Sequence, residues 1–149
     1  MRAEFEPRRH EEHEGGTKKR GYRAIPAEVE GIGRQVIDAA VEVHRELGPG
    51  LLESAYQRCL EHELQDRGLE VRCEVPLPVQ YKGRALEGGY RLDMLVENAV
   101  IVENKTVEEL LPIHTAQLLT YLKLSGHRLG FLLNWHVALM KHGIKRLVL

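Results

Sequence analysis

Two acidic residues and a lysine in the middle of the chain have the types and the spacing to bind a metal ion. Residues 90–105 alternate apolar and polar side chains on both sides of 97–99, which predicts two strands joined by a three-residue hairpin loop. In that register Asp93 lies opposite Glu103, and Lys105 shares their face because strand side chains repeat every second residue. Facing carboxylates repel each other by roughly 0.2–1 kcal/mol when exposed, and by more when desolvated. A divalent cation would convert that repulsion into affinity.

The chemistry that this arrangement predicts is metal-assisted hydrolysis of a phosphodiester bond. Asp93 and Glu103 supply the hard oxygen ligands that Mg²⁺ and Mn²⁺ prefer, and the carbonyl of Asn104 is a candidate third ligand. The metal would lower the pKa of its bound water and stabilise charge on the phosphate. Lys105 would position the attacking water or stabilise the negative transition state. The pattern Asp-x(9)-Glu-x-Lys alone is weakly specific, because such residues recur on solvated hairpins, so a plain surface hairpin stays open as the alternative.

Four further polar residues are placed where they could join such a site. Glu53 follows the Gly-Pro-Gly break at 48–50, and its carboxylate could reach the metal directly or through water. Its alternative role is that of a first-turn acid favoured by the helix dipole, worth about 0.3–1 kcal/mol. His114, Gln117 and Tyr121 share one face of a predicted helix and could orient the phosphate or the metal-bound water. For Tyr121 a half-buried core position, and for His114 simple exposure, remain open.

The remaining pattern predicts the elements that position these residues. Helical periodicity and Gly or Pro breaks predict helices at 26–47, 52–67 and 112–126. Apolar runs predict strands at 69–79, around 81–84, on both sides of the hairpin loop, at 128–135 and at 144–149. The core face of the hairpin is expected to hold Leu92, Met94, Val96, Val100 and Val102, and that of the second helix Leu52, Tyr56, Cys59, Leu60 and Leu64. We expect a mixed α/β (α+β) fold, in which helices flank one central mixed sheet.

Length and composition limit the class of protein. A chain of 149 residues with 43% hydrophobic and 29% charged residues is typical of one globular domain. Residues 1–24 are nearly devoid of apolar side chains and are predicted to be a disordered charged tail, so the domain is expected at 25–149. A net charge of −1 means that any phosphate-binding surface must be local. Without a signal-like or membrane-spanning apolar run, and with Cys59 and Cys73 lacking metal-ligand spacing, we expect a cytoplasmic protein.

Several motifs together resemble the GxxExxY family of small bacterial proteins, which are compact relatives of the PD-(D/E)xK nuclease superfamily. The resemblance covers about residues 27–149 and rests on the motifs at 37–50, 50–56, 81–83, 90–93, 102–105, 116–122 and 143–146. It implies a single-domain core like that of restriction endonucleases. It also implies roles for individual residues: Asp93, Glu103 and Lys105 as the catalytic signature, Glu53 as the helical glutamate of such sites, and Gln117 with Tyr121 as the motif on the following helix.

One residue departs from the family pattern. Asn104 stands between Glu103 and Lys105, where the family commonly has Leu. Alternation places its side chain on the core face, where an amide without hydrogen bonds costs about 1–3 kcal/mol. Its carbonyl can still bind metal, so the departure puts the local packing in doubt rather than the ligand set.

Two functional hypotheses follow. The first is a metal-dependent nuclease that hydrolyses DNA or RNA with Mg²⁺ or Mn²⁺, and the intact Asp, Glu and Lys set favours it. The second is a catalytically silent nuclease-fold module that binds nucleic acid or serves a larger complex, and the balanced charge favours it. No membrane partner is expected. A nuclease fold this small often pairs to cover two strands, so a homodimer is compatible with the sequence.

Overall fold

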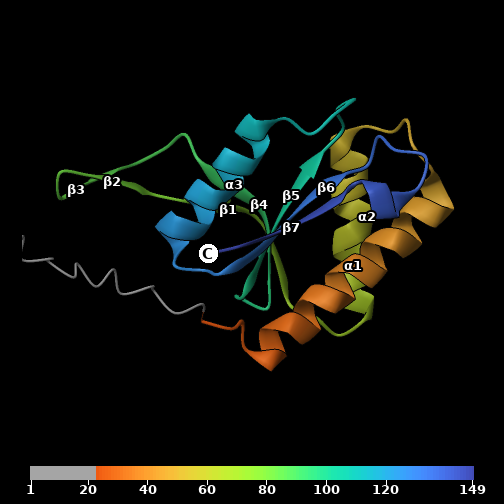
Figure 1. Ribbon diagram of the computed structural model, residues 1–149, viewed down its shortest axis with the longest axis horizontal. Coiled ribbons are helices and arrows are strands. Elements are labelled where there is room, and N and C mark those ends of the chain that lie inside the picture. The colour runs from red at the N-terminus through yellow and green to blue at the C-terminus, as the bar shows by residue number, and fades with distance from the viewer. Residues whose placement is uncertain (1–22) are drawn as a thin grey trace, which may run out of the picture.

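The computed structural model describes residues 23–149, and its elements are labelled in Figure 1. The predicted charged tail at 1–24 therefore falls almost entirely outside the described residues. The helices are α1 (Ala27–Leu47), α2 (Glu53–Asp66) and α3 (Pro112–Ser125), with a 3-10 turn η1 (Met140–His142). The strands are β1 (Val71–Pro76), β2 (Val79–Tyr81), β3 (Arg84–Leu86), β4 (Arg91–Val96), β5 (Val100–Lys105), β6 (Leu129–Asn134) and β7 (Ile144–Val148). The predicted helices agree with α1, α2 and α3 to within one or two residues at each end.

The central sheet is mixed, as predicted. Its five strands have the order β1-β4-β5-β6-β7, and β2 pairs with β3 in a separate hairpin. β5 and β6 run parallel, whereas every other neighbouring pair in this sheet is antiparallel. A parallel pair needs a crossover connection, and α3 supplies it between β5 and β6. The site residues on β5 are therefore followed directly by the helix that crosses over the sheet.

Helices cover both faces of the sheet (Figure 1). α1 and α2 pack on one face, where their apolar side chains join Met94, Val96 and Val102 in the larger core cluster. α1 approaches β6 closely at Gly33, where an added Cβ would lie 3.0 Å from a methyl carbon of Leu129 and would make neighbouring side chains shift slightly. α3 packs on the other face through a smaller cluster, in which Leu118 and Leu122 meet strand residues. None of the described helices is long and apolar enough to cross a membrane.

Two details of the predicted core were wrong. Leu92 packs with Leu95 and Ile101 under α3, not with Met94 on the face under α1 and α2. The strand changes face at Asp93, where the described ladders to β1 and β5 contain no residue pair. Leu52 was expected on the buried side of the second helix, but its side chain is 76% exposed. It precedes α2 as an extended N-cap residue, so helical periodicity does not apply to it.

The connection between α1 and α2 is fixed by one tyrosine. α1 ends at Gly48, whose φ of 66° suits a residue without a Cβ. The hydroxyl of Tyr56 donates to the carbonyl of Gly48 and accepts from the N–H of Leu51. Tyr56 is itself fully buried, and its ring stacks on that of Trp135 at a centroid distance of 4.8 Å. This connection sets the position of Glu53, the first residue of α2.

Candidate active site

The hairpin between β4 and β5 has the predicted register. Val96 pairs with Val100 and Met94 with Val102, which leaves the predicted loop at 97–99. Glu97 and Asn98 both have left-handed φ values, 51° and 49°. The expectation that Asn98 tolerates this conformation is met, and Glu97 adopts it as well. The same register brings Asp93 next to Glu103 at the open end of the hairpin.

At that end side chains replace the backbone ladder. The N–H of Asp93 donates to Oε1 of Glu103 at 3.1 Å. The N–H of Asn104 donates to Oδ2 of Asp93 at 2.8 Å. Each carboxyl group is therefore held by a main-chain amide of the facing strand. A side-chain hydrogen bond between Asp93 and Glu103 also links the two carboxyl groups and influences the pKa of each.

Burial changes the acidity of both carboxyl groups. Glu103 is 3% exposed, and burial, followed by the negative charge of Asp93, raises its pKa to about 9. Asp93 is half-buried, and burial raises its pKa as well, although the hydrogen bond from Asn104 opposes this. Two like charges this close are unfavourable without a compensating cation. The metal-free pair therefore favours holding a proton between the two carboxyl groups at neutral pH.

Lys105 belongs to a chain of hydrogen bonds that leads along α3. Its Nζ donates to Oε1 of Gln117 at 3.2 Å, and Nε2 of Gln117 donates to the hydroxyl of Tyr121 at 2.9 Å. The ammonium lowers the pKa of Asp93 and of Glu103, but no ion pair within residues 23–149 includes it. Lys105 thus stands beside the carboxyl pair and is oriented by Gln117. Tyr121 is 5% exposed, and burial, followed by the charge of Glu103, raises its pKa.

His114 stands apart from this chain of contacts. It lies in the first turn of α3, and its Nδ1 accepts a hydrogen bond from the N–H of Leu111 at 2.9 Å. This is a capping contact, in which a side chain satisfies the backbone before the helix. The structure therefore joins Gln117 and Tyr121 to Lys105, whereas His114 makes a capping contact and also lines the cavity that Lys105 and Gln117 line; its part in substrate binding stays a prediction.

Glu53 is exposed at the first position of α2. Partial burial and the charge of Asp93 raise its pKa, whereas Lys105 lowers it. Glu53 thus lies within the electric field of Asp93 and Lys105. However, no three acidic, histidine or cysteine side chains of residues 23–149 converge closely enough to hold a metal ion together. Direct coordination by all three carboxylates is therefore absent from this conformation.

The side-chain amide of Asn104 is hydrogen-bonded, which resolves the doubt that the sequence raised about its burial. Asn104 is fully buried, its Oδ1 accepts from Nε1 of Trp135 at 3.0 Å, and its Nδ2 donates to Oε1 of Gln57 at 3.2 Å. The hydrogen-bonded amide links the tip of β5 to α2. Sequence reasoning missed Gln57 and this role of Trp135. The signal that could have found them is the buried polar residue itself, since a core amide requires nearby partners.

The donor set fits a small hard cation. Mg²⁺ is commonly held by one or two carboxylates, while water and substrate phosphate complete its octahedron. Asp93 and Glu103 present two carboxyl groups from neighbouring strands, and a dication would replace the proton that links them and relieve their mutual repulsion.

The fold and the site together are those of an α/β protein with a mixed sheet flanked by helices, in which an Asp on one strand lies beside a Glu-x-Lys strand. A family model described as the PD-(D/E)XK nuclease superfamily matches residues 30–147, and the chain belongs to this superfamily. The match spans all of the elements that carry the site. Neither the curated proteins nor the solved structures contain a match to this chain.

Proposed function

We propose that this protein is a metal-dependent nuclease that hydrolyses phosphodiester bonds in DNA or RNA. The observation that carries the proposal is the pair of a buried Glu103 and a half-buried Asp93, which lie side by side and are each held by an amide of the other strand. A buried pair of like charges is unfavourable in itself, and a bound cation would offset the repulsion between them. Membership in the nuclease superfamily supports nucleic acid as the substrate.

The proposed ligands of Mg²⁺ or Mn²⁺ are the carboxylates of Asp93 and Glu103 and the carbonyl of Asn104. Glu53 would join through a water molecule, because it lies in the field of Asp93 without forming a compact cluster of three acids. When bound, the ion would lower the pKa of a water molecule and stabilise charge on the phosphate. Ligation requires both carboxyl groups in their ionised form, so the proton that the metal-free pair retains must leave first.

The other residues of the site act on the substrate. Lys105 would stabilise the negative charge that develops on the phosphate, because its ammonium lies beside the carboxyl pair and forms no ion pair with any residue of 23–149. Gln117 would hold that ammonium in position and orient the substrate, and Tyr121 would fix the amide of Gln117. These are positioning contacts, which contribute to catalysis by keeping the lysine in one geometry.

The narrower assignment to the GxxExxY family is part of the proposal. Its motif corresponds to Gly50, Glu53 and Tyr56. The hydroxyl of Tyr56 fastens the connection before Glu53, which gives the motif a physical reason for containing a tyrosine. A cytoplasmic location is proposed with it, supported by Cys59 and Cys73, which are both free thiols.

A silent nucleic-acid-binding module is the competing function, and one observation favours it. Lys105 donates a hydrogen bond to Gln117 rather than to Asp93 or Glu103. The lysine and the two acids of the catalytic signature are therefore not joined by a direct ion pair in residues 23–149. In a silent module this contact would be permanent. In an enzyme, substrate phosphate would compete for the ammonium.

Cleavage assays separate the two functions. Labelled single-stranded and duplex DNA and RNA are incubated with the protein in Mg²⁺, in Mn²⁺ and in EDTA. We expect metal-dependent cleavage of at least one substrate, lost in Glu103→Gln and in Lys105→Ala. The matched control is Lys123→Ala, which removes an exposed lysine of α3 and should cleave normally. Nucleic-acid binding without cleavage in any metal, identical in all variants, would establish the silent module instead.

A further inference from the structure

A cavity beside the candidate active site has the properties of a base-binding subsite. It has a volume of about 640 Å³, within the range of small-molecule sites, and we call it the α3 pocket. It lies against α3 and the segment that enters β4. The residues of its wall used below are Tyr90, Lys105, Ile113, Gln117, Tyr121 and Leu124.

The α3 pocket is continuous with the proposed catalytic site. Lys105 and Gln117, which hydrogen-bond to each other, belong to both. A phosphate beside the ammonium of Lys105 would therefore sit at the mouth of the pocket. The nucleoside attached to that phosphate is the nearest group that could enter it.

The lining suits an aromatic group attached to an anion. It contains no carboxylate, its charged residue is Lys105, and the remainder is largely apolar, including Ile113 and Leu124. Tyr90 is 49% exposed and meets Tyr121 edge to face at 6.2 Å. An edge-to-face pair leaves a ring face of the exposed tyrosine open, and nucleobases stack on such faces whatever their sequence.

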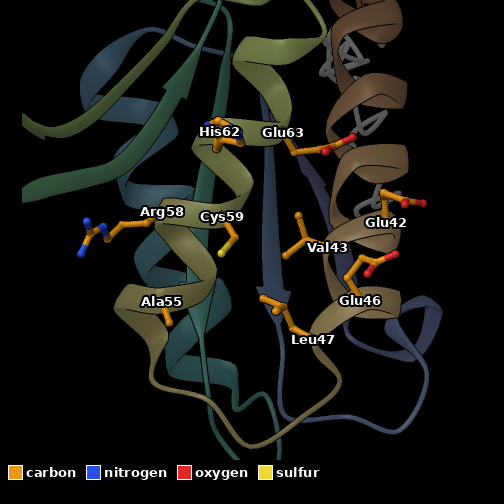
Figure 2. Close-up of a pocket in the computed structure, with 9 residues that line it drawn as sticks. All are labelled: Glu42, Val43, Glu46, Leu47, Ala55, Arg58, Cys59, His62 and Glu63. Atoms are coloured by element: carbon orange, nitrogen blue, oxygen red, sulfur yellow. The ribbon is translucent and has the colours of Figure 1, made fainter.

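A second cavity of similar size has an acidic lining, which is unsuited to nucleic acid. The groove between α1 and α2 in Figure 2 has a volume of about 690 Å³ and is slightly larger. Glu42 and Glu46 on α1, with Glu63 on α2, line it, and Arg58 points away from α1 in this view. Three carboxylates repel a polyanion, so size alone does not select the α3 pocket.

We propose that the α3 pocket binds one unpaired nucleobase of the strand whose phosphate lies at Lys105, so that the preferred substrate is single-stranded at the site of cleavage. The inference rests on the proposed function, which places the phosphate there. A base in a duplex is stacked on both faces and offers only its edges, whereas an unpaired base can be splayed out onto an aromatic side chain. The pocket therefore selects for strand separation rather than for sequence.

The test measures binding apart from cleavage. In the Glu103→Gln background, fluorescence anisotropy is measured with labelled oligothymidylate and oligouridylate, and with a hairpin duplex of matched length. Adding Tyr90→Ala should weaken single-strand binding by about 5- to 150-fold, which corresponds to a base–aromatic stack of 1–3 kcal/mol at about 1.4 kcal/mol per tenfold change. Tyr90→Phe should bind like its parent, because it keeps the ring. Duplex binding should be weaker and unchanged by either variant.

The matched control is Tyr81→Ala, which removes a tyrosine that is 59% exposed on the β2–β3 hairpin and outside the pocket. It should leave single-strand binding unchanged. Circular dichroism melting of each variant verifies folding. The inference is overturned if Tyr90→Ala binds like its parent, if Tyr81→Ala loses as much, if the duplex loses as much as the single strand, or if the parent binds no oligonucleotide.

Failure of the proposed function gives a different result. If the wild type cleaves in Mg²⁺ while Tyr90→Ala matches its parent in binding, the nuclease stands and the base subsite fails. If single strands bind through Tyr90 but no substrate is cleaved in any metal, the subsite stands and the nuclease fails.

Discussion

The main-chain N–H of Asp93 donates to Oε1 of Glu103 at 3.1 Å, so one proposed metal ligand holds the other in place. The contact keeps the two carboxyl groups together even though their charges repel. Asn104 completes the arrangement through its own N–H, which donates to Asp93 at 2.8 Å. The backbone hydrogen bonds thus hold together two carboxyl groups that repel each other when both are ionised. This has measurable consequences for stability and for metal binding.

The metal-free protein should lose stability as the pH rises from about 4.5 to about 9. The pKa of Glu103 is raised from 4.5 to about 9 in the folded state, so the folded protein binds more protons than the unfolded chain across this interval. The free energy of unfolding falls with pH wherever the folded state holds the extra protons. Melting temperatures in EDTA across this range measure the slope, and Glu103→Gln should flatten it. A slope that is unaffected by Glu103→Gln would show that Glu103 ionises normally.

Above pH 9, where both carboxyl groups are ionised, Asp93→Asn should raise the melting temperature in EDTA by roughly 2–8 °C, as expected for removal of about 1 kcal/mol of like-charge repulsion. The substituted side chain retains an oxygen to accept from the N–H of Asn104. Differential scanning calorimetry measures the shift. An unchanged or lower melting temperature would contradict facing charges.

Mn²⁺ should reverse the order of these two proteins. A ligand that binds the folded state alone at one hundred times its Kd adds about 2.7 kcal/mol of stability. The wild type should gain this increment and Asp93→Asn should gain little. Calorimetric titration should also show proton release on Mn²⁺ binding and tighter binding at higher pH, because Glu103 must ionise to become a ligand. Equal stabilisation of both proteins by Mn²⁺ would place the ion elsewhere.

Within the proposed nuclease, Lys105→Ala should lower kcat by about 100- to 1000-fold, as does loss of one charge-stabilising group in other active sites. Gln117→Ala should lower kcat by a smaller factor, about tenfold, since it removes a hydrogen bond to the ammonium and leaves the charge. Tyr121→Phe should have a weaker effect still, because it acts through Gln117. Single-turnover kinetics tests this order, and a Gln117→Ala enzyme that changes KM alone would assign the residue to substrate binding.

Trp135→Phe should destabilise the protein by about 1–3 kcal/mol, because it leaves Oδ1 of the buried Asn104 without its donor. The double variant Trp135→Phe with Asn104→Leu should recover part of that loss, since the amide is then absent. Urea unfolding of the four proteins in this cycle gives the coupling energy. Additive losses would mean that the two side chains do not interact.

The sequence predicted the elements well because their ends are marked locally. Gly48 ends α1 and Pro112 begins α3, and each acts through its own backbone geometry. The hairpin register followed from the short loop and the alternation on both sides of it. Mg²⁺ or Mn²⁺ binding and the roles of the site residues remain predictions.

The errors arose where a distant segment decides the outcome. Leu92 changes face because β4 loses its regular pairing at Asp93, opposite Glu74 of β1, which has a φ of 52°. The hydrogen bonds of Asn104 depend on Trp135, which is far away in the sequence. Helical periodicity cannot report any of these contacts.

The hydrogen bonds from Asn104 to Gln57 and from Trp135 to Asn104, with the ring of Tyr56 lying flat on Trp135, join α2 to β5 without using either carboxyl group. The spacing between the first turn of that helix and the acidic strand is consequently set during folding, by contacts that no substrate or ion needs to make. The site would therefore be preorganised before a nucleic acid binds, and little binding energy would be needed to bring α2 and β5 into position.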